Sequence, residues 1–167
     1  MKKLIRIVLG LIVVHLAGNA LAQQNATPDL QQGNVLQFQF SPYTYHFSED
    51  SEHKDVVMVG VEREYPNAKL DGITLFRNSF GQDSVYIYPW GQVYHSLAGI
   101  KPLSFKWTAG LLYGYVAPYE NKVPLNYNGF SPGLILALTY DFAPGWSGQV
   151  NMLGTAALMF QLNVQLK

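Results

Sequence analysis

Hydrophobic and polar residues alternate with a period of two along most of the chain beyond residue 34. The clearest case is 103–116, where Phe105, Trp107 and Ala109 fall on one face and Ser104 and Lys106 on the other. This period is typical of a β-strand with two different faces. Clusters of Gly, Pro, Asn and Asp separate the alternating segments and indicate turns. The pattern predicts eight strands, at about 35–45, 56–65, 70–80, 84–94, 103–116, 130–141, 146–153 and 157–166.

The first 22 residues follow a different pattern. Lys2, Lys3 and Arg6 precede a mostly apolar run at 7–16, and the small residues Ala20 and Ala22 bracket Leu21. This is the pattern of a secretory signal peptide, and the run is shorter than the ~20 residues of a transmembrane helix. We therefore expect a cleaved signal peptide at 1–22, a polar periplasmic lead-in at 23–34 and one β-domain at 35–167.

Composition narrows the class of protein. The predicted signal peptide contains three of the eleven Lys and Arg residues and none of the eleven acids, which leaves a mature net charge of −3 and argues against a nucleic-acid partner. The chain has no cysteine, so it has neither disulfides nor a cysteine-based metal site. It is rich in tyrosine, with eleven, and only 13% of its residues are charged. Two readings fit an exported chain of this kind: a soluble β-domain or an outer-membrane barrel.

Eight strands are the number found in the smallest common transmembrane barrels, whose strands are about 9–11 residues long. Closing the sheet also removes exposed strand edges, at which chains otherwise aggregate. We therefore predict an all-β fold, an eight-stranded antiparallel up-and-down transmembrane β-barrel of the outer membrane, present as a monomer. A soluble periplasmic lipid-binding barrel remains as an alternative.

The inward-facing positions predict a gradient along the barrel axis. If the N-terminus is periplasmic, Glu62, Lys106 and Thr139 fall in the periplasmic half, whereas Gly110, Leu112 and other small or apolar residues fall in the outer half. Glu62 and Lys106 are expected to pair, because an unpaired buried charge is costly. Two readings of the apolar half stay open: a core filled by side chains, or a slot for an acyl chain.

Candidate catalytic residues gather at the outer rim. The connections after the first and third strands lie at the same end, which allows His46, Asp83 and Ser84 to converge there. Histidine is the commonest general base, and a turn carrying Ser84 could supply donors to an oxyanion. The competing interpretation of His46 is an ordinary solvated loop histidine. His53 competes for the same role, whereas His95 falls at the periplasmic end.

These residues resemble a known family, the lipid A palmitoyltransferases of the PagP type. Members carry a histidine in the first outer loop and an Asp-Ser pair at the top of the third strand. The segments that carry the resemblance are TYHFSED, FGQDSVYIYPWG, FKWTAGLL, VPLNYNGFSPGLILAL and LMFQLNVQL. The resemblance implies transfer of palmitate from a glycerophospholipid to a hydroxyl of lipid A, with no metal or cofactor. His46 would act as base, Asp83 would orient it, and Ser84 would help to hold the oxyanion.

The resemblance also implies lateral entry of lipid, because the family interrupts strand pairing with prolines. A glycine floors the family's acyl pocket, and Gly91 is its nearest counterpart here. Arg77 and Lys54 are candidates to meet lipid A phosphates, although solvated charges explain each alone. The candidate acyl-pocket and gate residues are Pro42, Met58, Gly60, Tyr88, Gly91, Gly110, Leu112, Gly114 and Pro132.

Two other functions stay open at this point. A non-enzymatic structural or adhesive barrel would tolerate alanine at His46, Asp83 and Ser84. A lipid A deacylase of similar size is the other, but the late strands of this sequence lack the His-x-Ser motif that such enzymes carry there.

Overall fold

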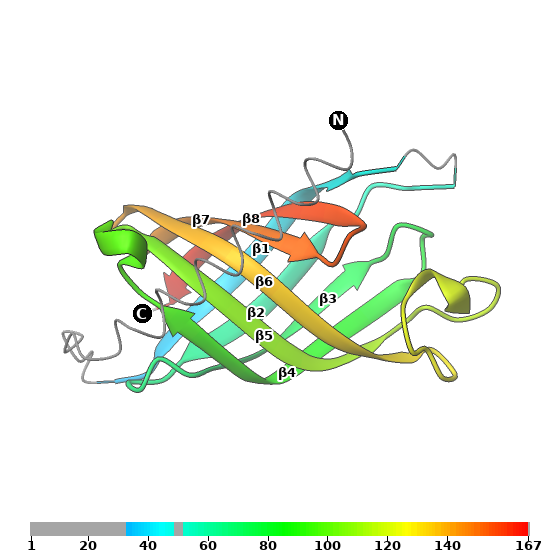
Figure 1. Ribbon diagram of the computed structural model, residues 1–167, viewed down its shortest axis with the longest axis horizontal. Helices are drawn as coiled ribbons and strands as arrows, with labels where there is room; N and C mark the ends of the chain where they lie inside the picture. The colour runs from blue at the N-terminus through cyan, green and yellow to red at the C-terminus, as the bar shows by residue number, and fades with distance from the viewer. Residues whose placement is uncertain (1–32, 49–51, 167) are drawn as a thin grey trace.

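The computed structural model describes residues 33–48 and 52–166, which form a closed, all-β barrel of eight antiparallel strands (Figure 1). The predicted all-β antiparallel barrel and its number of strands are therefore confirmed. The strands are β1 (Val35–His46), β2 (Met58–Glu64), β3 (Leu70–Arg77), β4 (Asp83–Tyr94), β5 (Leu103–Tyr113), β6 (Phe130–Ala143), β7 (Trp146–Leu153) and β8 (Ala157–Leu166). The predicted signal peptide and most of the lead-in lie outside the described residues.

Each strand pairs with its neighbour in sequence, and the β1–β8 pair closes the barrel. That closing ladder runs from Leu36 opposite Leu166 to His46 opposite Ala157. Two short 3₁₀ helices interrupt the connections: η1 (Leu97–Gly99) between β4 and β5, and η2 (Glu120–Lys122) between β5 and β6. Within the described residues, no helix is long and apolar enough to cross a membrane, a finding that does not bear on crossing by strands.

The two ends of the barrel differ in their connections. The His46 end, at the right of Figure 1, carries the long connections β1–β2 and β5–β6 and the short ones β3–β4 and β7–β8. The His95 end carries the connections β2–β3, β4–β5 and β6–β7. The strand bounds predicted from the sequence also leave long segments after the first and fifth strands, at 46–55 and 117–129. His46 and the β3–β4 turn lie at the same rim.

The outer face of the wall is apolar, whereas most of the inward residues of the His95 half are polar. This arrangement follows from the period-two pattern and matches that of transmembrane barrels. The large apolar side chains exposed on the strands include Leu36, Phe38, Phe40, Val59, Val61, Ile73, Leu75, Ile87, Leu111, Leu134, Leu138 and Phe160. The faces predicted from the alternation are therefore correct.

A connected polar network fills the His95 half of the interior. Lys106 and Glu62 form the predicted ion pair, with side chains 5% and 3% exposed. Lys106 Nζ also donates to Gln149 Oε1 at 3.2 Å, and Tyr88 Oη donates to Glu62 Oε2 at 3.2 Å. Charges buried at this depth are tolerable only because they are paired and hydrogen-bonded.

The His46 half is only partly the apolar zone that the sequence predicts. Val56, Met58 and Met159 form a buried apolar cluster, against which Phe76 and Leu153 pack. However, small polar side chains are buried there as well. They include Ser41, Asn78, Ser84 and Ser131. The predicted gradient is thus present but weaker than expected, because hydroxyl and amide groups at this rim hold backbone atoms of the loops.

Tyrosine rings occupy the space beside two inward-facing glycines. A Cβ on Gly133 would lie 2.5 Å from Tyr86 Cε2, and one on Gly72 would lie 2.3 Å from Tyr88 Oη. The Tyr86 and Tyr88 rings stack with centroids 5.1 Å apart. In this part of the barrel the glycines therefore accommodate protein side chains, which favours the filled-core reading over an open acyl slot.

Prolines coincide with irregular pairing in three places. The β1–β8 register shifts between Phe40 and Tyr43, around Pro42. The β6–β7 ladder spans Leu136 to Ala143, so Pro132 lies beyond it. In β4 the pairing with β5 shifts between Ile87 and Trp90, and both Pro89 and Trp90 face outward. Proline cannot donate to a ladder, which confines it to such places.

Candidate functional site

A hydrogen-bonded histidine and serine define the candidate site at the His46 end. His46 is the last residue of β1, and Ser79 follows β3 by two residues. His46 Nε2 and Ser79 Oγ lie 2.7 Å apart. Ser79 is 8% exposed. A base and a hydroxyl within this distance form the pair that activates a serine nucleophile.

A row of ring contacts begins at the His46 imidazole. His53 lies beside it with ring centroids 4.2 Å apart, and Phe80 packs against His53 at 5.5 Å. Tyr119 then stacks on Phe80 at 4.4 Å. Burial and the neighbouring His53 imidazole lower the pKa of His46. A neutral His46 is the form that can accept a proton.

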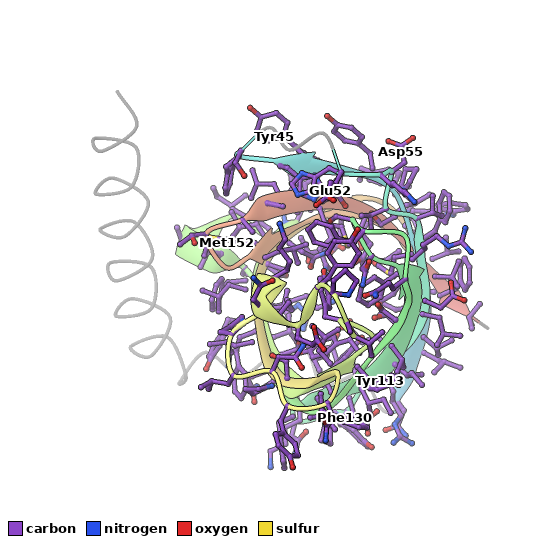
Figure 2. The ribbon with its side chains drawn as sticks, turned by 90° about the vertical axis from the view of Figure 1, so that its right-hand side faces the viewer. Tyr45, Glu52, Asp55, Tyr113, Phe130 and Met152 are labelled. Atoms are coloured by element: carbon purple, nitrogen blue, oxygen red, sulfur yellow. The ribbon has the colours of Figure 1, made fainter. Side chains whose placement is uncertain are left out.

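The β5–β6 connection covers this end of the barrel. Figure 2 looks onto the His46 end and shows this loop, with η2, crossing in front of the opening. Glu52 and Asp55 of the β1–β2 connection lie on one side of the ring, and Tyr113 and Phe130 lie on the opposite side. Lys122 lies over the Phe80 ring at 4.8 Å. Burial raises the pKa of Tyr115, in the same loop, to about 12. The loop therefore covers the aromatic side of the site.

Asn78 organises the turn that carries Ser79. Its side chain is fully buried, and its Oδ1 accepts hydrogen bonds from the backbone N–H groups of Phe80 at 3.0 Å and Gln82 at 3.1 Å. Its Nδ2 donates to Ser84 Oγ at 3.1 Å and to the Gly114 carbonyl at 3.2 Å. Asn78 thus holds the β3–β4 turn against the end of β5 and fixes the position of its neighbour Ser79.

The predicted partners of His46 have other contacts. Asp83 begins β4 with its side chain 90% exposed, and its Oδ1 accepts from Arg77 Nε at 3.4 Å. Ser84 faces inward, accepts from Asn78 and donates to the Gln82 carbonyl at 3.3 Å. The expectation that Asp83 orients His46 is therefore not met, because this carboxylate faces outward. Ser84 instead supports the turn beneath Ser79.

The oxyanion donors expected from the turn carrying Ser84 are also engaged. The N–H groups of Phe80 and Gln82 donate to the Asn78 side chain, and that of Gly81 donates to the Asn78 carbonyl at 2.8 Å. A cation is present beside this turn instead. Lys54 Nζ lies 2.9 Å from the position that a Cβ on Gly81 would take, and Lys54 N donates to the Ser79 carbonyl at 2.7 Å.

The other predicted site residues fall into two groups, one on the inner face of the barrel and one on the outer face. Met58, Gly60, Tyr88, Gly91 and Gly114 are buried on the inner face, and Gly110 and Leu112 are half-buried there. Pro42 and Pro132 are exposed on the outer face, as lateral openings would require. The bulge at Pro89 turns Gly91 toward the interior of the barrel. A Cβ on Gly91 would lie 2.9 Å from Leu70 Cβ.

His95 lies at the opposite end, as predicted, in a second hydrogen-bonded cluster. Its Nε2 bonds Glu64 Oε1 at 2.7 Å, and its Nδ1 bonds Ser104 Oγ at 3.2 Å. The hydrogen bond to Glu64 raises the pKa of His95. Residues 33–48 and 52–166 contain no group of three or more His, Asp or Glu side chains arranged to hold a metal ion.

Sequence reasoning missed Ser79 because it extended the third strand to residue 80, which placed Ser79 inside a strand. The structure ends β3 at Arg77. The signal was present, because Asn78, Ser79 and Gly81 are residues that turns favour. The resemblance also placed the family's pair at the top of the third strand. Asn78 and Ser79 hold that position here, whereas Asp83 and Ser84 begin the fourth strand.

Comparisons with known proteins assign no family. No family model matches the chain, and no curated protein matches it. One solved structure is described as the crystal structure of a protein with unknown function from Clostridium acetobutylicum ATCC 824. It aligns at 6% identity and a TM-score of 0.18, over 80% of this chain and 95% of that one. A likeness at this level carries no argument about fold or function, which are argued from this chain alone.

Proposed function

We propose that the protein is an outer-membrane acyltransferase that moves a palmitoyl chain from a glycerophospholipid to a hydroxyl of lipid A. The observation that carries the proposal is the 2.7 Å contact between His46 Nε2 and Ser79 Oγ. This pair lies at the rim of a closed barrel with an apolar outer face. Acyl transfer needs a base placed on a hydroxyl, and lipid substrates need a protein that meets the bilayer.

In the first step the hydroxyl of Ser79 acts as nucleophile. Its oxygen attacks the ester carbonyl carbon of the phospholipid while its proton passes to His46 Nε2. The bond to the glycerol oxygen then breaks, and His46 returns the proton to that oxygen. The products are a lysophospholipid and an acyl ester on Ser79. Lys54, beside the turn, supplies positive charge near the developing oxyanion.

In the second step His46 takes a proton from the lipid A hydroxyl. That oxygen attacks the acyl carbonyl, and the Ser79 oxygen leaves with the proton from His46. The acyl chain would lie against the buried cluster of Val56, Met58 and Met159 below the rim. Methionine side chains adapt to different occupants at small cost. The protein then returns to its starting protonation state, and no metal or cofactor takes part.

Lipid A mass spectrometry tests the proposal. Cells that express the protein should gain one acyl chain on lipid A, and His46→Ala or Ser79→Ala should remove that gain. The matched control is Asp83→Ala, because its side chain is 90% exposed and faces away from the site. We expect this variant to keep the activity. An unmodified lipid A under membrane stress would overturn the acyltransferase assignment, and the loss of an acyl chain would indicate deacylation instead.

A cysteine variant tests the covalent step separately. Ser79→Cys should accumulate a thioester after exposure to phospholipid, visible as a mass increase of one acyl group that hydroxylamine removes. Ser84→Cys is the control, because Ser84 hydrogen-bonds Asn78 and the turn. Activity that survives Ser79→Ala would exclude the acyl-serine intermediate while leaving the overall reaction in place.

A further inference from the structure

The outer wall of the barrel contains a groove that the proposed reaction does not use. Its volume is about 400 Å³, within the range of ligand pockets. It crosses β1 to β4, which are consecutive neighbours in the closed sheet. The lining residues are Leu36, Val61, Arg63, Asp71, Gly72, Ile73, Ile87, Tyr88 and Pro89.

The groove exists because β4 bulges at Pro89. The β3–β4 ladder ends with Gly72 opposite Tyr88, and the backbone pairing is interrupted up to the bridge between Lys69 and Gln92. Gly72 and Tyr88 both face the interior, where the Tyr88 hydroxyl reaches Glu62, so neither places a side chain on the outer face here. A depression in the outer face results, while the inner face stays filled.

The groove is apolar along most of its length and ionic at one end. Val61, Ile73 and Ile87 line it and are 37%, 43% and 48% exposed. Toward the His95 end, Arg63 and Asp71 form a bidentate pair, with Nη2–Oδ2 at 2.6 Å and Nε–Oδ1 at 3.1 Å. The Arg63 side chain is 44% exposed, and Asp71 also accepts from Tyr65 Oη at 2.6 Å.

We propose that this groove binds one zwitterionic glycerophospholipid, such as a phosphatidylethanolamine. An acyl chain lies along the apolar part, and the head group meets the ion pair. The guanidinium N–H groups of Arg63 that do not reach Asp71 donate to the phosphate, and the remaining lone pair of Asp71 Oδ1 accepts from the ammonium group. A head group that carries both charges complements an ion pair better than a purely anionic or uncharged one. The proposal rests on the membrane location and not on acyl transfer.

The position of the ion pair also selects a leaflet. Arg63 and Asp71 lie near the His95 end, whereas the candidate site lies at the His46 end. A phospholipid in the groove therefore has its head group at the surface opposite the reaction. With the His46 end outward, this is the periplasmic leaflet. The groove is thus a binding site for a phospholipid of the opposite leaflet, separate from the proposed donor position.

Native mass spectrometry of the folded barrel in detergent, with phosphatidylethanolamine added, tests the proposal. The wild type should retain one phospholipid. Ile73→Trp, which fills the groove, should lower that retention several-fold. Leu134→Trp on β6 is the matched control, because Leu134 is also exposed on the outer face, at 62%, and is not among the groove residues. Circular dichroism and heat-dependent gel mobility establish that each variant is folded.

A second comparison tests the head group. Phosphatidylethanolamine should be retained in preference to diacylglycerol with the same chains, and Arg63→Gln should remove the preference. Equal retention by wild type and Ile73→Trp, or no preference between the two lipids, would overturn the proposal. Failure of the acyltransferase assignment leaves these measurements unchanged. Failure of the membrane location would appear instead as a barrel that does not associate with vesicles.

Discussion

The His95 half of the barrel interior is a connected set of polar side chains, whereas the His46 half combines methionines, small hydroxyl groups and the His46–Ser79 pair. In the first half almost every polar group is bonded to another side chain, such as Lys106 to Glu62 and Gln149. In the second, polar side chains mainly hold loop backbone, as Asn78 does. The difference indicates that one half stabilises the barrel and the other positions groups at the rim. Four predictions test this division.

Removing one partner of the buried ion pair should give the largest effect. Lys106→Met leaves Glu62 buried and unpaired, and we expect a loss of about 3–5 kcal/mol in the free energy of unfolding. Denaturant unfolding in detergent micelles measures it. The double variant Lys106→Met with Glu62→Met should recover most of the loss, since no charge is left unpaired. If Lys106→Met is as stable as the wild type, the polar network of the His95 half does not stabilise the barrel as proposed.

Replacing Asn78 should affect both stability and the site. Asn78→Ala removes the acceptor for two backbone N–H groups and the donor to the Gly114 carbonyl, and we expect a loss of about 1–3 kcal/mol. Asn78→Asp keeps the acceptor oxygens but buries a carboxyl group against the Gly114 carbonyl, so its effect should be at least as large. Lipid A acylation should fall as well, because the β3–β4 turn that positions Ser79 becomes less ordered. Unchanged acylation in a destabilised Asn78→Ala protein would show that Asn78 does not position Ser79 for the reaction.

Filling the space beside Tyr86 tests whether the middle of the barrel is full. A Cβ on Gly133 would meet the ring at 2.5 Å. Gly133→Ala should destabilise the barrel by about 1 kcal/mol, a small cost for overpacking, because the Tyr86 ring is the end of a side chain that can tilt. Adding Tyr86→Leu should offset the clash. Stability that is unchanged in Gly133→Ala would instead indicate open volume available to an acyl chain.

The smallest effect concerns pH at the His95 end. The pKa of His95 is raised by Glu64, so the contribution of this pair is fully present below the unfolded value of about 6.5. It is lost as pH rises through the raised folded value. The stability difference between wild type and His95→Gln should therefore be larger at about pH 5.5 than at about pH 8.5. Because the His95 side chain is 45% exposed, we expect less than about 1 kcal/mol. A difference that does not vary with pH would contradict this.

The alternation of hydrophobic and polar residues was enough to predict most of the fold. It predicted all eight strands and their inward faces, and with them the Glu62–Lys106 pair, because a strand fixes which side chains share a face. The alternation could not predict the details that depend on irregular backbone. The end of β3 at Arg77 decides that Ser79, and not Ser84, meets His46, and the bulge at Pro89 decides the orientation of Gly91. The first depends on the hydrogen bonds of the Asn78 side chain within the turn and to Gly114, and the second lies at a proline, which cannot donate to the ladder. A period of two predicts neither.

Four carboxamides in the His95 half form a closed ring. Gln149 donates to Asn151, Asn151 to Gln161, Gln161 to Asn163, and Asn163 back to Gln149. All four come from β7 and β8, which are joined by a short connection. This hairpin can therefore satisfy its own inward polar groups before the sheet closes. A late-forming seam between β8 and β1 would then join a preassembled C-terminal hairpin to the rest of the chain. The ring thus bears on the order of barrel assembly as well as on the stability of the finished protein.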